Sequence, residues 1–265
     1  MRLRALLIGD IVGEPGRAIL TRRLRPWRET HRVDLCIANG ENASGGSGIT
    51  PDNARELFNA GVDVITTGDH VWKRKEAAAL LQAEPRVLRP QNYSPLAAGA
   101  GVGLYTLPGD VKVAVINLLG RVFMKPADCP FRGVDDVLRQ LAPLTPNVFV
   151  DIHAEATAEK IALGWHLDGR VTAVFGTHTH VQTADERVLP KGTAFICDLG
   201  MTGPYESVLG RRTDRVLQAS LTQMYYGFDV AKGDVRFSGA LVEFDPQNGR
   251  ACAIERVHVR EDSTP

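Results

Sequence analysis

Seven side chains that can bind a metal ion stand shortly after apolar runs of this sequence. Three are carboxylates, one is an amide and three are imidazoles: Asp10, Glu41, Asn42, Asp69, His153, His178 and His180. A mixture of carboxylate and imidazole suits Zn, Mn or Fe, and the lack of cysteine disfavours a soft or purely structural site. The set is larger than one tetrahedral ion requires, so we expect two ions that share a bridging carboxylate. Two ions about 3.5–4 Å apart can clamp a phosphoryl group and generate a hydroxide.

Each of these residues also has an ordinary structural explanation. A single aspartate after a strand, such as Asp10 or Asp69, more often caps a helix or closes a turn. A lone histidine there usually only satisfies a hydrogen bond. The pair His178 and His180 is a stronger signal, because imidazoles two residues apart can face one point. Since five strand-to-turn junctions carry metal-compatible groups, we favour the metal site. Three further histidines are assigned to the surface or to packing: His31, His166 and His258.

The metal-compatible groups fall at one edge of the expected sheet. Apolar runs typical of buried strands in a parallel or mixed sheet cover residues 3–8, 33–38, 62–67 and 147–152 and the segment before His178. Ligand sites in open α/β sheets lie beyond the carboxyl ends of the strands, so the three imidazoles are expected beside one pocket.

A helix is expected between the two histidine-bearing strands. Thr157 is its expected N-cap, residues 158–168 form the helix, and Gly169 is the C′ residue. Such a helix provides the crossover that brings the two strand ends side by side.

The rest of the chain predicts further elements of an α/β fold. Thr50 caps a helix that has Pro51 at its first position and Gly61 at its end. Pro108 and Gly109 predict the turn of a hairpin. The other expected segments are helices over residues 15–30, 134–141 and 214–223, hairpin strands over 103–107 and 111–118, and strands over 187–189, 193–197, 235–243 and 252–259. Residues 81–95 show a weak pattern, residues 198–212 are expected to be a loop, and residues 118–133 a long lid or interface loop.

Composition limits the classes of function. The chain has 265 residues, a formal net charge of zero and 44% hydrophobic residues, which are ordinary values for a soluble globular protein. A neutral chain argues against a protein that grips long nucleic acid by its backbone. No run is long and apolar enough to span a bilayer, and Asp10 interrupts the first apolar run too soon for a signal peptide. We expect Cys36, Cys197 and Cys252 to be reduced core residues of a cytoplasmic protein with one domain over residues 1–265.

The glycine-rich loop over residues 42–48 has two interpretations. It follows a strand but matches neither a Walker A loop nor a dinucleotide-binding fingerprint. Its backbone N–H groups could contact a phosphate. Alternatively, its glycines let the chain pass close to the metal ions.

Five motifs together resemble the YmdB-like metallophosphoesterases of the calcineurin-like superfamily. They are GDIVGEPGR, NGENASGGSGIT, GDHVWKR, DIHAEATAEK and GTHTHVQTAD, and the resemblance covers nearly the whole chain. It implies a four-layer α/β/β/α sandwich of two mixed sheets with a dinuclear centre. It also implies hydrolysis of small phosphodiesters, above all cyclic nucleotides, including 2′,3′-cyclic mononucleotides. Iron or manganese, with zinc also compatible, and a homo-oligomer are implied as well.

The resemblance also implies a role for each motif residue. Asp10 and His180 would hold one ion, Asp69, His153 and His178 the other, and Glu41 would bridge both, with Asn42 beside them. His70 would be the proton donor. Where the family usually has Asn, this chain has Asp69, which changes the charge of the centre.

Two other functions compete with this interpretation. One is a phosphomonoesterase or another dinuclear hydrolase. The other is a regulatory protein that binds a nucleotide or an RNA end and uses its metals structurally. His70 favours an enzyme, because a purely structural site needs no free proton donor beside it.

Overall fold

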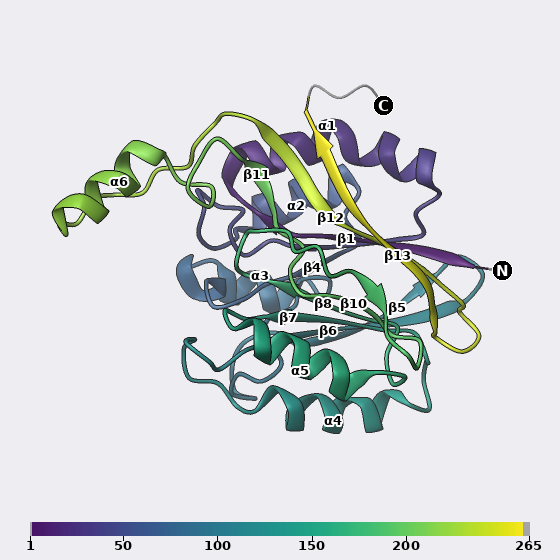
Figure 1. Cartoon of the computed structure of the whole chain (residues 1–265). Coiled ribbons are helices and arrows are strands. Elements are labelled where there is room, and N and C mark those ends of the chain that lie inside the picture. The colour runs from purple at the N-terminus through teal and green to yellow at the C-terminus, as the bar shows by residue number, and fades with distance from the viewer. Residues whose placement is uncertain (1, 262–265) are drawn as a thin grey trace.

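Two β-sheets pack face to face and carry helices on their outer surfaces, so the molecule has four layers (Figure 1). The computed structural model describes residues 2–261. The expected α/β/β/α sandwich of two mixed sheets is confirmed. Among residues 2–261, none of the helices combines the length and the apolar character that crossing a membrane requires.

The first sheet has seven strands in the order β2-β11-β12-β1-β3-β4, with β13 paired to β12. Its parallel centre joins β1 to β3 and β3 to β4, while β12 runs antiparallel to β1 and β13. The strands are β1 (Leu3–Ile8), β2 (Asp10–Ile11), β3 (Leu35–Asn39), β4 (Val64–Thr66), β11 (Met201–Pro204), β12 (Val235–Phe244) and β13 (Ala251–Arg260).

The second sheet has six strands in the order β5-β6-β7-β8-β10-β9. The four central strands from β6 to β10 are parallel, and the outer pairs β5–β6 and β9–β10 are antiparallel. The strands are β5 (Val102–Leu107), β6 (Val111–Leu119), β7 (Val148–His153), β8 (Ala173–Thr177), β9 (Arg187–Val188) and β10 (Ala194–Ile196).

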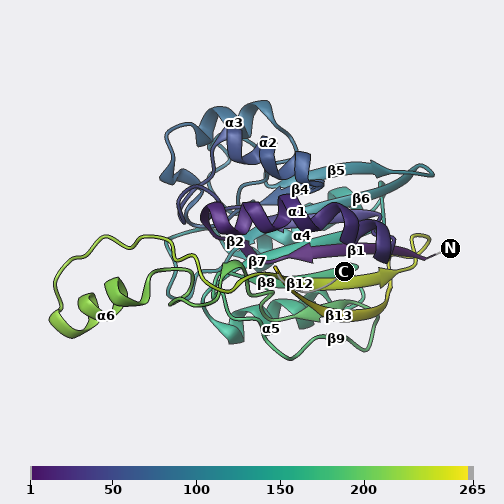
Figure 2. The same ribbon diagram turned by 90° about the horizontal axis from the view of Figure 1, so that it is seen from above.

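The helices cover the two outer faces. Helices α1 (Gly13–His31) and α2 (Pro51–Ala60) cover the first sheet, and α4 (Pro130–Leu141) and α5 (Thr157–Leu167) cover the second. Helix α3 (Ala77–Ala83) lies beside β4 and adds Leu80 and Leu81 to the core beneath α1 and α2. A short 3₁₀ helix spans Val71–Lys73. Helix α6 (Thr213–Thr222) stands away from this body in both views (Figure 2), and all ten of its residues are at least partly exposed.

Strand alternation divides the apolar side chains among three cores. Along β1, Leu6 packs toward α1, whereas Leu7 packs between the sheets with residues such as Phe149 and Phe244. The period of two in a strand requires this division. Because both sheets are covered on both faces over their centres, the strands carry the near-continuous apolar runs seen in the sequence. The three cores hold the strand ends in fixed positions, and the polar residues that follow are positioned with them.

Several predicted local features are confirmed. The Thr50 hydroxyl accepts a hydrogen bond from the Asn53 N–H at 3.3 Å, Pro51 is the first helical residue, and Gly61 ends α2 with φ of 113°. The hairpin of β5 and β6 pairs Leu107 with Val111 across the predicted turn.

Other local predictions are wrong. Ala156, not Thr157, is the N-cap of α5, and it makes no side-chain capping bond. Residues 198–212 contain β11, whose sequence MTGP has little strand propensity and is held by pairing with β2 and β12. No element was predicted for residues 77–83, where the structure has helix α3. Cys252 is exposed rather than in the core, because β13 is paired to β12 alone and turns this side chain outward.

Candidate metal centre

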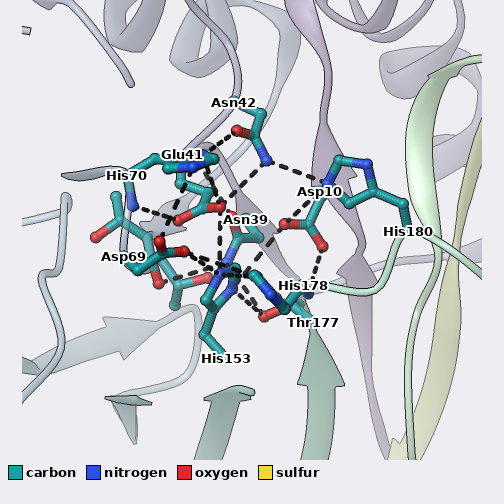
Figure 3. Close-up of polar contacts among 12 residues, drawn as sticks. Asp10, Asn39, Glu41, Asn42, Asp69, His70, His153, Thr177, His178 and His180 are labelled. Carbon is teal, nitrogen blue, oxygen red and sulfur yellow. Dashed lines mark hydrogen bonds and ion pairs between the residues drawn. The ribbon is translucent and has the colours of Figure 1, made fainter. Parts of the chain in front are cut away.

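The strand ends of the two sheets meet at one place and bring all seven sequence-predicted side chains together (Figure 3). From the first sheet, Asp10 starts β2, Glu41 and Asn42 follow β3, and Asp69 follows β4. From the second sheet, His153 ends β7, and His178 and His180 follow β8. The sheets pack face to face, so carboxylates from one meet imidazoles from the other.

Four of these side chains form a group that could hold a metal ion. Glu41, Asp69, His153 and His178 each offer a ligand atom, and these atoms lie within 4.8 Å of one another. The Nε2 atom of His153 lies 3.2 Å from Glu41 Oε1 and 3.5 Å from Asp69 Oδ1. Asp69 Oδ1 is buried and has no hydrogen-bond partner among the described residues. A buried carboxylate oxygen without a partner is costly, and a cation would satisfy it.

A second cluster lies on the other side of Glu41. Asp10 Oδ1 is buried, lies 3.8 Å from His180 Nε2, and also lacks a hydrogen-bond partner within residues 2–261. The Asn42 amide Nδ2 lies 3.2 Å from His180 Nε2 and donates to Glu41 Oε1 at 3.2 Å. Glu41 therefore stands between two sets of ligand-type atoms.

The backbone around these groups is closely fitted. A Cβ atom at position 68 would lie 2.2 Å from His153 Cδ2 and 2.3 Å from Glu41 Oε2. Only glycine therefore fits at this position, directly before Asp69. Gly68 thus lets the chain bring Asp69 close to the His153 imidazole of the other sheet.

A buried polar network on the Nδ1 side of His153 was not predicted from the sequence. Thr177 Oγ1 donates to Asp151 Oδ1 at 2.8 Å and lies 2.9 Å from His153 Nδ1. Thr66 Oγ1 and Asn39 Nδ2 donate to Asp151 Oδ2 at 2.5 and 3.2 Å. With Thr177 donating to Asp151, His153 donates from Nδ1 and turns Nε2 toward Glu41, as metal-ligating histidines commonly do. The one available signal was the carboxylate of Asp151 inside the apolar run VFVDIH.

The surroundings favour the charged form of Glu41 and Asp69 but not that of Asp10. Burial raises the pKa of Asp10. Burial also raises the pKa of Glu41 and of Asp69, but the neighbouring His153 outweighs it and the net pKa of both carboxyls is lowered. Burial lowers the pKa of His153, yet Glu41 and Asp69 raise it well above its ordinary value. Burial and the charge of His153 lower the pKa of His178. A cation among these carboxylates would replace the stabilising charge of His153.

His70 stands at the open edge of the group. Its backbone N–H donates to Glu41 Oε2 at 3.1 Å, and its Nδ1 lies 2.8 Å from Asn42 Oδ1. The side chain is 31% exposed, against 1% or less for Glu41 and His153. Nδ1 is held by Asn42, which leaves Nε2, 3.9 Å from Asp69 Oδ2, as the ring nitrogen without a hydrogen bond among the described residues.

Lys125 is a further residue at this edge that the sequence did not indicate. It comes from the long loop after β6, and its Nζ donates to the Asp69 carbonyl at 3.2 Å and lies 3.5 Å from Asp69 Oδ2. The loop is anchored by Glu159 of α5, which accepts the backbone N–H groups of Arg121 and Val122. A positive side chain is therefore placed beside the carboxylates.

The other three histidines lie apart from the centre. His31 stacks on Trp27, His166 contacts Asp135, and His258 bonds to Ser238. These contacts agree with their assignment to the surface and to packing.

The four-layer sandwich with a carboxylate and imidazole group at its strand ends defines a metallophosphoesterase-type fold. The family model described as YmdB-like protein matches residues 6–257, and the chain belongs to this family. A Bacillus subtilis protein named 2′,3′-cyclic-nucleotide 2′-phosphodiesterase is 43% identical over 260 residues, 98% of each chain.

Two solved structures have the same fold. A crystal structure of a hypothetical protein from Thermus thermophilus has a TM-score of 0.92 and 42% identity, covering 97% of this chain and 99% of that one. The structure of a novel phosphatase from Mycoplasma pneumoniae also has a TM-score of 0.92, at 31% identity, covering 98% and 94%.

Proposed function

We propose that this protein is a metal-dependent phosphodiesterase that hydrolyses small nucleotide phosphodiesters, including 2′,3′-cyclic mononucleotides. The observation that carries the proposal is the metal-compatible group of Glu41, Asp69, His153 and His178 with the partly exposed His70 beside it. The name of the Bacillus subtilis relative supports the substrate class.

The proposed ligand sets follow the two clusters. Asp10 and His180 would hold one ion, and Asp69, His153 and His178 the other. Glu41 would bridge both, since its Oε1 lies 3.2 Å from His153 Nε2 and is linked to His180 through the Asn42 amide. Asn42 would lie beside the first ion or the phosphate. The carboxylate oxygens of Asp10 and Asp69 that lack hydrogen-bond partners among the described residues support both sets.

Two ions, iron or manganese with zinc also compatible, would supply positive charge for the phosphoryl oxygens and acidify a water molecule. The protein's own residues do the rest. The network of Thr177 and Asp151 holds His153 with Nε2 toward Glu41 and Asp69. Asn42 holds His70 by Nδ1. As the P–O ester bond breaks, His70 would give a proton from Nε2 to the leaving oxygen.

A substrate panel tests the proposal. The purified protein, loaded with Mn²⁺ or with Fe²⁺ under reducing conditions, is assayed on 2′,3′-cyclic AMP, nucleoside monophosphates and bis(p-nitrophenyl) phosphate. We expect turnover of the cyclic nucleotide, with the product isomer identifying the bond that is cleaved, and no turnover by a His153→Ala control. Preference for monophosphates would establish a phosphomonoesterase instead. Tight nucleotide binding without turnover would establish a regulatory binding protein.

We further propose a cytoplasmic homo-oligomer whose chain forms one domain, as the sequence and the family resemblance imply. Size-exclusion chromatography with light scattering measures the oligomer, and a monomer at micromolar concentration would contradict this part of the proposal.

A further inference from the structure

The turn that carries two of the proposed ligands has an unfavourable backbone conformation. His178 and His180 have φ of 101° and 65°, a region that side chains other than glycine rarely adopt. Between them lies Thr179, which is partly exposed and whose hydroxyl donates to Asp198. Such a conformation persists only where surrounding contacts hold it. Contacts outside the ligand clusters must therefore hold this turn in place.

Asp198 holds the turn through Thr179. Its Oδ2 accepts the Thr179 backbone N–H at 3.1 Å and the Thr179 hydroxyl at 2.7 Å, while Oδ1 accepts the Gly200 N–H at 2.8 Å. Asp198 follows β10, which runs parallel to β8, so the two strand ends lie side by side. The carboxylate is 1% exposed.

Lys160 of α5 balances the buried charge of Asp198. Its Nζ lies 2.7 Å from Asp198 Oδ2, and Lys160 is also 1% exposed. The lysine stem reaches this point beneath Gly176 of β8, where an added Cβ would lie 2.8 Å from Lys160 Cδ. A buried pair with these hydrogen bonds has one geometry, because moving either partner leaves an uncompensated charge. The pair of Lys160 and Asp198 thus connects helix α5 to the turn over residues 178–180.

We propose that Asp198, paired with Lys160, is a positioning residue that clamps Thr179 and so aims His178 and His180 at the two ligand clusters. Neither residue touches the metal-compatible group itself. The proposal rests on the proposed metal-dependent function and adds to it the device that makes both imidazoles converge. Groups that hydrogen-bond a metal ligand directly commonly change metal affinity about 10–100-fold, and Asp198 acts on the two histidines through the residue between them.

The test separates the clamp from ordinary packing with three variants. Thr179→Val removes the hydroxyl that reaches Asp198 and keeps the shape of the side chain. Thr179→Ser restores the hydroxyl. Thr183→Val is the matched control, because within residues 2–261 the Thr183 hydroxyl bonds to the backbone N–H and carbonyl of Asp198 and not to its carboxylate. For each protein we measure the Mn²⁺ dissociation constant, the Tm without metal and the rise in Tm that Mn²⁺ produces.

We expect Thr179→Val to bind Mn²⁺ about tenfold or more weakly and to lose part of the metal-induced rise in Tm. Thr179→Ser should regain most of the affinity, and Thr183→Val should keep it. Wild-type affinity in Thr179→Val, or an equal loss in Thr183→Val, would overturn the proposal. If valine prevents folding, Thr179→Ala removes the same hydroxyl and is measured instead.

The outcome is independent of the substrate. A wild-type protein that binds Mn²⁺ but hydrolyses no phosphodiester would refute the proposed function, while the affinity series would still decide on the clamp. A wild-type protein that binds no metal would refute both.

Discussion

His153 and His178 come from neighbouring parallel strands, and Nδ1 of His178 lies 3.0 Å from Nε2 of His153. The register pairs His153 with Thr177, so the two imidazoles meet edge to face at the sheet end. Two nitrogens that each lie about 2.1 Å from one ion are about 3.0–3.4 Å apart at bond angles between octahedral and tetrahedral. The 3.0 Å separation is that of a hydrogen bond between the two rings, and two nitrogens at this separation can also ligate one ion without moving apart.

The first prediction concerns the histidines of the 178–180 turn. His178→Ala should empty the ion shared with His153, and His180→Ala should empty the ion beside Asp10. Each variant should therefore bind about one ion fewer and lose turnover, as measured by metal analysis and by hydrolysis of 2′,3′-cyclic AMP. His166→Ala, which lies apart from the centre, is the control. Full metal content with normal activity in both variants would contradict the dinuclear site.

Much of the centre could be predicted because its signals are local. Asp10, Asp69 and His153 each stand at the end of an apolar run, and parallel strands bring such ends to one edge. Except for Asp151, the residues that support them carry no local signal. Lys125 comes from a loop far along the chain, and Asp198 follows a strand of only three residues. Their roles depend on tertiary contacts that the sequence pattern does not contain.

The same limit explains the errors in the fold. Strand β11 is held in the first sheet by its neighbours although its sequence contains glycine and proline. The N-cap of α5 is Ala156 and not the predicted Thr157. The helix begins where the turn after β7 ends, and the hydroxyl of Thr157 does not determine that position. Tertiary packing overrides such weak local preferences.

The second prediction concerns His70 as the proton donor. His70→Ala should keep its metals, because its side chain is outside the group of Glu41, Asp69, His153 and His178. It should lose about 10²–10⁴-fold in kcat on cyclic nucleotides, whose leaving alkoxide needs a proton. The loss on bis(p-nitrophenyl) phosphate should be much smaller, since nitrophenolate leaves without one. Equal losses on both substrates would mean that His70 positions the substrate instead.

The third prediction concerns the buried carboxyl of Asp151 in the metal-free protein. Burial raises the pKa of Asp151 from its ordinary 3.8 to about 6. A raised folded-state pKa means that the native protein holds this proton more firmly than the unfolded chain. The contribution of this proton to the free energy of unfolding is fully present below about pH 4 and is lost as the pH rises through 6. The contribution is about 3 kcal/mol at most.

Asp151→Asn should remove this dependence. The difference in the free energy of unfolding between wild type and variant, from urea titrations between about pH 4 and 7, should shift in favour of the variant as the pH rises. Asp52→Asn, an exposed position in the first turn of α2, serves as the control. Parallel pH curves for wild type and Asp151→Asn would show that Asp151 is charged in the native state throughout.

The fourth prediction concerns Asp69, where the family resemblance implies Asn. Its Oδ1 faces His153 and has no hydrogen-bond partner among residues 2–261, while its Oδ2 lies 3.5 Å from Lys125 Nζ. One oxygen is thus available to an ion and the other is paired with a cation. A charged ligand should hold its metal more tightly than an amide but leave the ion a weaker Lewis acid.

Asp69→Asn should therefore lose metal faster to a chelator, and its pH–rate profile should move to lower pH.

Lys125→Met tests the pairing of Lys125 with Asp69. In the wild-type background it leaves the Asp69 charge uncompensated, so it should change both metal retention and the profile. In the Asp69→Asn background it should change them much less, because the charge it balances is gone. The four proteins form a double-mutant cycle, with the rate of metal loss and the midpoint of the profile as readouts. If Asp69→Asn retains metal like wild type and its profile does not move, Asp69 is not an anionic ligand. If Lys125→Met acts equally in both backgrounds, Lys125 does not act through Asp69.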